Sequence, residues 1–466
     1  MPGNTLARQA CSFFLARLEA ETSRLREISF PGHDIGPRRW LNFILGVLNT
    51  GRTYLEQSKE GSLSEPDANR LIEFAEIAGT NAYTFLRHVT GADATEIPHE
   101  IVAPFQRWVA GLQITNTIFF RAEHLPNYEL GWLDARAFRK FPSATQSLID
   151  AIDKIEWPLL RVTVPGHAMD MLPHFAVVAH ELGHAIQDRI KIDLSKYSQE
   201  RKDCDNRIEQ RLLANNISFG PAQRLDVTTI FDNWINELKA DSVGHLLVGP
   251  AFFFALCGFL ELAGRNYGIA KTHPPTDLRK ELLMTELARG TPSFVATFAK
   301  KTGMTITANI NSPSVPTCPT GDALYSELLT AYSPTDAAIC TELVPYLRKI
   351  GPAVFDAART YLTQNSPVLL YSPSQLEMDL GEPLEMLCSL IPPIESHSST
   401  PDNPKAMGLA SILNIGWAAL LTRLDRIPDK GTDPAFADSR RYNQLHQLLL
   451  KAVELAEARQ LWTDHA

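Results

Sequence analysis

The chain has 466 residues, of which 44% are apolar, so it is long enough for two or three domains and can bury a sizeable core. Its formal net charge of −9 and its 21% of charged residues provide no basic field of the kind that attracts nucleic acid or anionic lipid. We therefore expect a globular protein with no nucleic-acid partner.

The six cysteines lie far apart in the sequence and form no CxxC pair, which argues against a disulfide scaffold and against a cysteine-ligated zinc site. We expect them to be reduced and mostly buried thiols. The N-terminus does not resemble a secretory signal, because Arg8, Arg17 and Glu19 fall where a signal needs an uninterrupted apolar core. The sequence therefore predicts an N-terminal amphipathic helix and a cytoplasmic protein.

Residues 1–155 are predicted to form several helices, since apolar residues recur with a helical period in segments such as 39–48 and 67–85. Residues 158–165, with the sequence PLLRVTVP, are rich in β-branched and aliphatic side chains and form the best strand candidate. An extended substrate could pair with Arg161–Pro165 if this segment were an edge strand.

Residues 173–300 are predicted to be helical and contain all the predicted chemistry, whereas 304–321 combine a short β-prone piece with a Pro-rich and Ser-rich loop. The fold class is therefore mainly α with a small β element. The predicted division is a helical N-terminal region (1–155), a catalytic region (156–303), a linker (304–321) and a helical C-terminal region (322–466).

The segment Val243–Leu260 has no formally charged side chain and approaches the length that spans a bilayer. Gly249, Pro250 and two further glycines interrupt it, and it begins two residues after an aspartate that we assign below to a metal site. A buried core helix is therefore the first interpretation, and membrane association is the second.

The segment 173–190 reads PHFAVVAHELGHAIQDRI and contains the pattern HExxH. Residues four apart on a helix differ by about 40° in direction and about 6 Å in rise, so His180 and His184 can face one metal ion. Glu181 projects to the side, where it can act as a base toward a water whose pKa a zinc ion lowers to about 7. The pattern predicts a site for one Zn²⁺ ion.

A third ligand is needed, and the metzincin pattern does not supply it, because Gln187 and Ile190 stand where that class has glycine and histidine. Downstream, FDNWINELKAD places Glu237 and Asp241 one helical turn apart on the same face. Glu237 can complete the ligand set, and Asp241 can accept the N–H of His180 and fix its tautomer. The alternative is a solvated acidic helix face.

The segment 271–280, KTHPPTDLRK, holds His273 beside two prolines that stiffen the loop. His273 is a candidate donor toward the oxyanion that develops during hydrolysis, and an ordinary loop histidine is the alternative. His167, His174 and His245 also fall near the motifs, and we expect all three to be structural.

In this order, HELGH, NELKAD and THPPTDLR resemble the gluzincin metallopeptidases, and in particular the CAAX prenyl peptidase and heat-shock membrane peptidase group. The resemblance covers about residues 173–280. It implies a zincin-like core built on two zinc-binding helices, with His180, His184 and Glu237 as ligands and Glu181 as the base. It also implies that His273 steadies the transition state. It gives Arg279 no definite role.

Relatives in that group usually have transmembrane helices or an export signal, so the resemblance does not carry over a substrate class. Three functions follow from the sequence: a zinc endopeptidase acting on a protein or peptide, a regulatory metalloprotease-like sensor that cleaves one specific protein, and a non-catalytic zinc-binding module. A cytoplasmic endopeptidase is the leading hypothesis, with the N- and C-terminal helical regions restricting access to its site. The non-catalytic module ranks lowest, because Glu181 has no structural duty in a three-ligand site with an open fourth position. The sequence indicates no oligomeric state.

Overall fold

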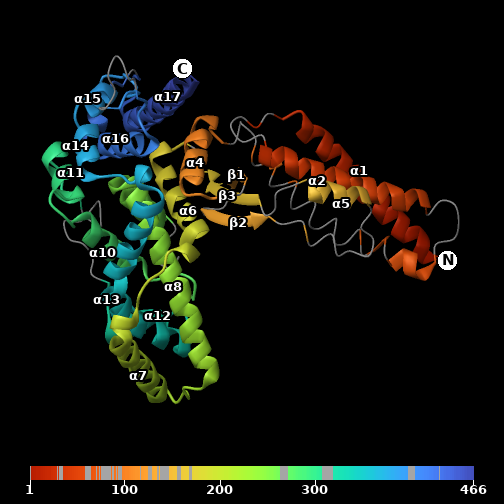
Figure 1. Cartoon of the computed structure of the whole chain (residues 1–466), viewed down its shortest axis with the longest axis horizontal. Helices are drawn as coiled ribbons and strands as arrows, with labels where there is room; N and C mark the ends of the chain where they lie inside the picture. Colours follow the sequence, from red (N-terminus) through yellow and green to blue (C-terminus); the bar gives the residue numbers. More distant parts are fainter. Residues whose placement is uncertain are drawn as a thin grey trace. The chain divides into compact units, whose positions relative to one another are not determined.

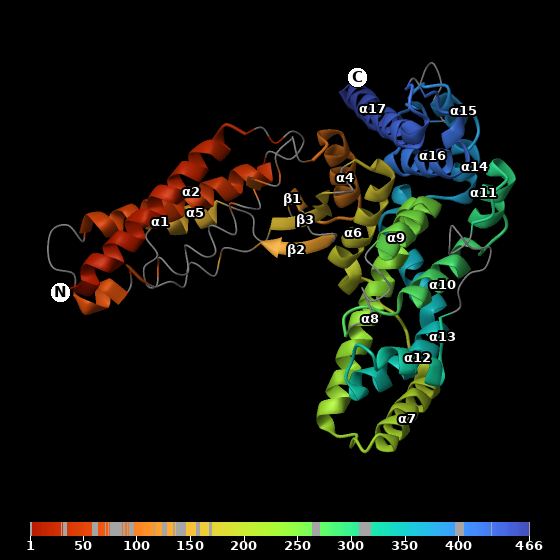
Figure 2. The same cartoon turned by 180° about the vertical axis from the view of Figure 1, so that it is seen from behind.

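In the computed structural model the described residues are mainly helical and form one small sheet (Figures 1 and 2). It describes residues 2–28, 30, 35–57, 64–69, 71–72, 74, 86, 89–90, 92, 97–115, 117–123, 128–133, 136, 146–154, 159–166, 170–262, 271–306, 318–396, 405–429 and 431–465. The predicted fold class, mainly α with a small β element, is confirmed at this level.

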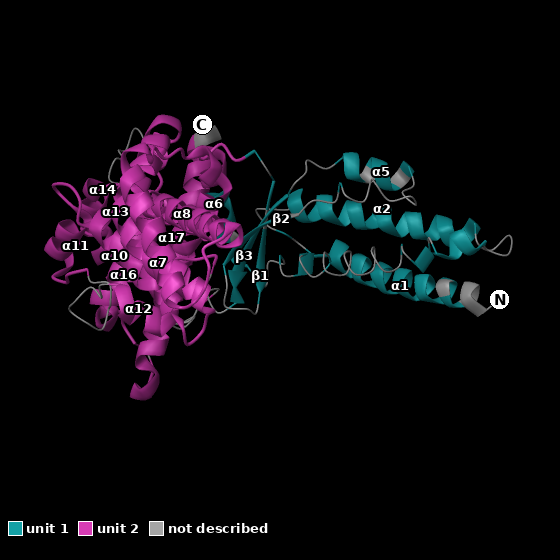
Figure 3. Ribbon diagram, turned by 90° about the horizontal axis from the view of Figure 1, so that it is seen from below, with its two compact units in different colours: residues 1–106, 115–169 teal, residues 107–114, 170–466 magenta. Residues whose placement is uncertain are grey.

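The described chain divides into two compact units, which Figure 3 distinguishes by colour. Unit 1 comprises residues 1–106 and 115–169, and unit 2 comprises 107–114 and 170–466. The boundary between the units falls at 169–170, after the strand that begins at residue 159. The predicted boundary, between 155 and 156, lies before this strand. Residues 307–317 of the predicted linker lie outside the described part, and the separation of 322–466 as its own region stays a prediction.

The helical part of unit 1 is built from amphipathic helices whose apolar faces meet. In the helix formed by Ile35–Gln57, large apolar side chains recur every three or four residues and are all buried: Trp40, Phe43, Ile44 and Val47. The helices of unit 1 with described bounds include α1 (Pro2–Arg26), α2 (Ile35–Gln57) and α5 (Gln146–Asp153), and α4 (His99–Gly111) has residues in both units.

The sheet of unit 1 has three strands, β1 (Ile118–Glu123), β2 (Glu129–Leu133) and β3 (Leu159–Pro165). Their order is β1-β3-β2, so β3 pairs with β1 in parallel and with β2 in antiparallel orientation. The predicted strand is confirmed over 159–165, but the expectation that it is an edge strand was wrong, because β1 pairs with residues 160–165 and β2 with residues 159–163. A substrate strand therefore cannot add to it.

Unit 2 consists of helices packed around α8 (Pro221–Val248). Pro221 occupies its first position, and the Gln223 side chain accepts a hydrogen bond from the Gly220 N–H at 3.1 Å, which caps the start of the helix. Helix α6 (Val178–Ile186) packs closely on α8, and the long α13 (Pro334–Asn365) packs on α8 and on α7 (Ser198–Ala214). The other helices are η3 (Leu172–Val177), η4 (Gln187–Arg189), η5 (Ser195–Tyr197), α9 (Pro250–Leu262), α10 (Thr276–Leu287), α11 (Phe294–Thr302), α12 (Gly321–Leu328), η6 (Pro367–Leu369), α14 (Pro373–Asp379), α15 (Glu382–Cys388), α16 (Leu409–Thr422), η7 (Leu424–Arg426), η8 (Pro434–Phe436) and α17 (Ala437–His465).

The apolar run at 243–260 belongs to two helices and not to the single helix that we expected. Gly249 has φ +67°, a conformation that ends α8 and that few residues other than glycine adopt, and α9 begins at Pro250. The Asn414 side chain stabilises this break, since it donates to Val248 O at 2.7 Å and accepts from Ala251 N at 3.0 Å. Within the described residues, none of the helices has the length and apolar character needed to cross a membrane.

Helices α16 and α17 anchor the segment that leads into α6. The Trp417 indole donates to Pro173 O at 2.9 Å, and His446 Nδ1 accepts from Leu172 N at 3.1 Å. Because η3 continues directly into α6, the C-terminal helices fix the start of the helix that carries HExxH. Six unpaired cysteines, all buried, complete the interior of the two units.

Candidate metal centre

The site lies where α6 packs against α8, and a glycine makes their close approach possible. A Cβ atom on Gly183 would lie 2.6 Å from Ala240 Cα and 2.9 Å from Ala240 O, distances that backbone atoms cannot tolerate. Glycine at the third position after the first histidine therefore lets the backbones of the two helices nearly touch. This brings side chains from 180–184 and from 237–241 into direct contact.

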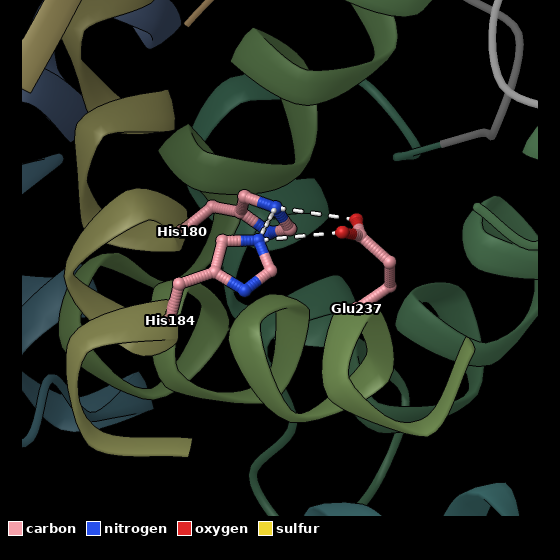
Figure 4. Close-up of side chains that lie close together, drawn as sticks. All are labelled: His180, His184 and Glu237. Atoms are coloured by element: carbon pink, nitrogen blue, oxygen red, sulfur yellow. Dashed lines mark hydrogen bonds and ion pairs between the residues drawn. The ribbon is translucent and has the colours of Figure 1, made fainter. Parts of the chain in front are cut away.

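Three side chains from these two helices converge on one point (Figure 4). His180 Nε2 and His184 Nε2 lie 3.1 Å apart, and they lie 3.4 Å and 3.3 Å from the two carboxylate oxygens of Glu237. Ligands of a tetrahedral zinc ion at their usual bond lengths are separated by about 3.3–3.4 Å. The two ring nitrogens and the Glu237 carboxylate therefore lie close enough together to share one ion, since one ligand atom from each residue lies within 4.8 Å of the other two.

Electrostatics also favour a cation at this point. Glu237 Oε2 is buried and has no hydrogen-bond partner among the described residues. Three carboxylates, on Glu181, Glu237 and Asp241, and one guanidinium, on Arg279, are buried, so their formal charges sum to −2 when both histidines are neutral, as metal ligands are. A buried charge without compensation is costly, and a divalent cation would neutralise this one. The residues present thus fit a Zn²⁺ ion.

Carboxylates determine the protonation of His180 when no metal is bound. Burial opposes a charge on its ring, but Asp241 and Glu237 outweigh burial and raise the pKa of His180 to about 10. Burial likewise opposes the negative charge of Glu237, yet His180 and His184 hold the pKa of Glu237 well below its usual value. The cluster therefore attracts positive charge, which is the property of a metal site.

Asp241 lies against His180, the histidine to which the sequence assigned it. Its Oδ1 is 2.9 Å from His180 Nδ1. Arg279, on α10, clamps the same carboxylate from the other side through two hydrogen bonds, Nε to Oδ2 at 2.8 Å and Nη2 to Oδ1 at 2.7 Å. Burial disfavours both charges, but Arg279 holds the pKa of Asp241 below its usual value, and Asp241 raises the pKa of Arg279.

Glu181 follows His180 on α6 and is 6% exposed. It makes no hydrogen bond and no ion pair with any residue that the structure describes. Its carboxylate is close enough to His184 and Arg279 to favour their charged forms. The sequence predicted a base beside the ligands, and the structure places there a carboxylate whose oxygens are not engaged by those neighbours.

His273 also reaches the cluster. Its Nε2 lies 3.5 Å from Glu237 Oε1, and its Nδ1 lies 2.8 Å from Thr272 Oγ1. The side chain is 43% exposed, which makes it the most accessible of the assembled groups. Partial burial lowers the pKa of His273 although Glu237 opposes this shift, so the neutral ring is favoured at neutral pH.

The sequence did not predict two contacts of the site. It gave Arg279 no role, whereas the structure shows that Arg279 binds the carboxylate of Asp241. Gln187 was used only to exclude the metzincin pattern, yet its Oε1 lies 2.8 Å from His184 Nδ1. The signal for Gln187 was present, because a residue three positions after His184 lies on the same face of a helix.

Two of the other histidines near the motifs, His245 and His174, lie apart from the three candidate ligands. His245 is buried between the rings of Phe294 and Phe355, at centroid distances of 5.7 and 6.1 Å. His174 packs on Trp417 at 5.1 Å. His167 lies outside the described residues.

One group of histidine, cysteine or acidic side chains in the described part of the chain has the spacing of a metal site, and it consists of His180, His184 and Glu237. The geometry is thus that of two helices that present three nitrogen and oxygen ligands, with a free carboxylate and a half-exposed imidazole beside them. No family model, no curated protein and no solved structure matches the chain, so the assignment rests on these residues alone.

Proposed function

We propose that the protein is a zinc-dependent peptidase with a zincin-like core, in which His180, His184 and Glu237 hold one Zn²⁺ ion. The observation that carries the proposal is the convergence of three side chains: His180 Nε2 and His184 Nε2 lie 3.1 Å apart and 3.4 Å and 3.3 Å from different oxygens of the Glu237 carboxylate. Beside them lies the unengaged carboxylate of Glu181. A purely structural zinc site has four protein ligands, whereas three ligands with a free carboxylate beside them are typical of a hydrolytic site.

When bound, zinc would act as a Lewis acid and lower the pKa of water to about 7. Glu181 then takes the proton from the water that attacks the peptide carbonyl carbon. It returns this proton to the amide nitrogen as the C–N bond breaks. His273, neutral and half-exposed, donates a hydrogen bond to the oxygen on which negative charge develops.

The order of the three motifs supports a peptide as the substrate, since it resembles that of the gluzincins. The six buried cysteines, all with free thiols, support a reducing compartment and hence the cytoplasm as the location. In that compartment an endopeptidase requires restricted access to its site.

The test is profiling of new peptide N-termini in a host lysate incubated with the wild-type protein or with Glu181→Gln. We expect new termini with wild type, and at least a 100-fold lower rate of their formation with Glu181→Gln, because the general base is lost. Both proteins should bind one equivalent of zinc, since Glu181 is not among the three ligands.

The matched control is Glu382→Gln, which alters an exposed carboxylate of the same unit and should cleave as wild type does. Cleavage of a single lysate protein would indicate the regulatory, sensor-like function. Equal cleavage by wild type and Glu181→Gln would refute the mechanism. Stoichiometric zinc without any new termini would indicate a non-catalytic zinc-binding module.

A further inference from the structure

The two ligand histidines have different partners at their Nδ1 atoms. His180 Nδ1 faces the carboxylate of Asp241 at 2.9 Å, whereas His184 Nδ1 faces the neutral amide oxygen of Gln187 at 2.8 Å. We propose that Gln187 is the positioning residue of the second metal ligand: its Oε1 accepts the Nδ1–H of His184, which leaves the Nε2 lone pair directed at the metal. This inference rests on the proposed zinc site but not on peptidase activity.

The backbone of Gln187 is held in place independently of the histidine. Gln187 is the first residue of η4, directly after α6, and its carbonyl accepts a hydrogen bond from Lys239 Nζ on α8 at 3.2 Å. Arg189, at the end of η4, donates to Leu112 O and Gln113 O, both at 3.2 Å. The amide is therefore presented to His184 from an anchored turn, which is what a positioning role requires.

The chemistry of the amide explains why the tautomer matters. An imidazole that donates from Nδ1 has its lone pair on Nε2, and the Nε2 atom of His184 lies 3.1 Å from His180 Nε2 and 3.3 Å from Glu237. If the ring carried its hydrogen on Nε2, it could not bind a metal there. A hydrogen-bond acceptor at Nδ1 thus selects the ligand form of the ring.

The choice of an amide over a carboxylate follows from the charge of the cluster. The buried groups around the ligands already sum to a formal charge of −2, which a divalent cation balances. A neutral acceptor at His184 orients the ring without adding a further negative charge that the cation would not balance. His184 is also the more exposed of the two ligand histidines, with 22% of its side chain accessible against 7% for His180, so it depends more on a fixed partner.

The experiment compares Zn²⁺ affinity, measured by competition with a chromophoric chelator, among wild type, Gln187→Leu and Gln187→Glu. We expect Gln187→Leu to bind about 10- to 100-fold more weakly, as is usual for loss of a partner of a ligand histidine. Gln187→Glu keeps an acceptor of the same length and should bind as tightly as wild type or more tightly. Gln447→Leu, an exposed glutamine on α17, is the matched control and should leave the affinity unchanged.

A second readout separates positioning from general damage to the fold. The visible spectrum of bound Co²⁺ should change with Gln187→Leu and be restored with Gln187→Glu. Gln187→Leu with an affinity within about threefold of wild type, or an equal loss with both substitutions, would overturn the inference while the zinc site stood. Failure of the wild-type protein itself to bind Zn²⁺ would overturn the inference together with the proposed function.

Discussion

Two buried histidines of unit 2, His180 and His245, differ only in what surrounds them. His180 is 5% exposed and faces two carboxylates, which raise the pKa of its ring to about 10. His245 is 1% exposed and lies between aromatic rings; burial, and to a smaller extent the charge of Arg359, lower its pKa to about 3. Burial disfavours the charge of both rings, so the partners decide the outcome.

The comparison shows how one long helix serves two purposes. Glu237 and Asp241 lie on α8 one turn apart and contribute to the candidate metal centre. His245 follows one turn later and packs between aromatic rings. A histidine near this motif thus belongs to the candidate site or to the core according to the carboxylates within its reach, and position along the helix alone does not decide this.

The largest effect is expected from removing the arginine behind the His180 network. Arg279→Met should lower the free energy of unfolding by about 3–5 kcal/mol, because it leaves Asp241 buried without its bidentate partner. Urea denaturation of the metal-free protein measures this loss. The matched control is Arg289→Met, whose side chain is 47% exposed and should contribute about 1 kcal/mol or less. Equal losses for the two variants would contradict the role assigned to Arg279.

A smaller effect, dependent on pH, is expected at His245. The unfolded imidazole binds a proton below about pH 6.5, whereas the folded one does so only below about pH 3, so unfolding takes up a proton between these values. Stability therefore falls as the pH decreases through this window, by about 2 kcal/mol at pH 5. His245→Leu should remove this part of the acid sensitivity.

The measurement for His245 is the free energy of unfolding in urea at pH 7 and at pH 5. Phe355→Leu alters the same pocket without an ionisable group and should retain the wild-type difference between the two values. If His245→Leu also retains the full difference, the lowered pKa of His245 in the folded protein would be contradicted.

The smallest effect on stability is expected at His273, the accessible histidine. His273→Gln should change the free energy of unfolding by about 0.5 kcal/mol or less, because the side chain is 43% exposed. Peptide cleavage should nevertheless fall about 100-fold or more if the imidazole stabilises the oxyanion. Parallel denaturation and cleavage assays test the two parts. Normal cleavage by His273→Gln would leave it an ordinary loop histidine.

Residues that act together within one or two helical turns could be predicted from the sequence. His180, Glu181 and His184 follow from the spacing of four residues on one helix, and Glu237 with Asp241 from the same spacing on a second helix, α8. The structure adds that these two helices meet at Gly183. Nothing in the local pattern specified this contact, since it depends on the path of the chain between residues 190 and 220.

The sheet shows the opposite case. The strand at 159–165 was evident from its β-branched residues, but its partners, β1 and β2, were not recognised, so its central position was missed. The apolar run at 243–260 was correctly expected to be buried, yet its division at Gly249 depends on Asn414, more than 150 residues away in the sequence. Pairing and capping at such separations leave no periodic signal.

The sequence by itself therefore determined the helical class of the protein and the identity of the candidate metal ligands, because helical periodicity and ligand chemistry are local properties. The tertiary structure decided which partners those ligands have: Arg279 behind Asp241, Gln187 behind His184, and the C-terminal helices behind η3. The physical reason is that burial and long-range packing control charge and orientation. Both depend on residues that the sequence holds far apart.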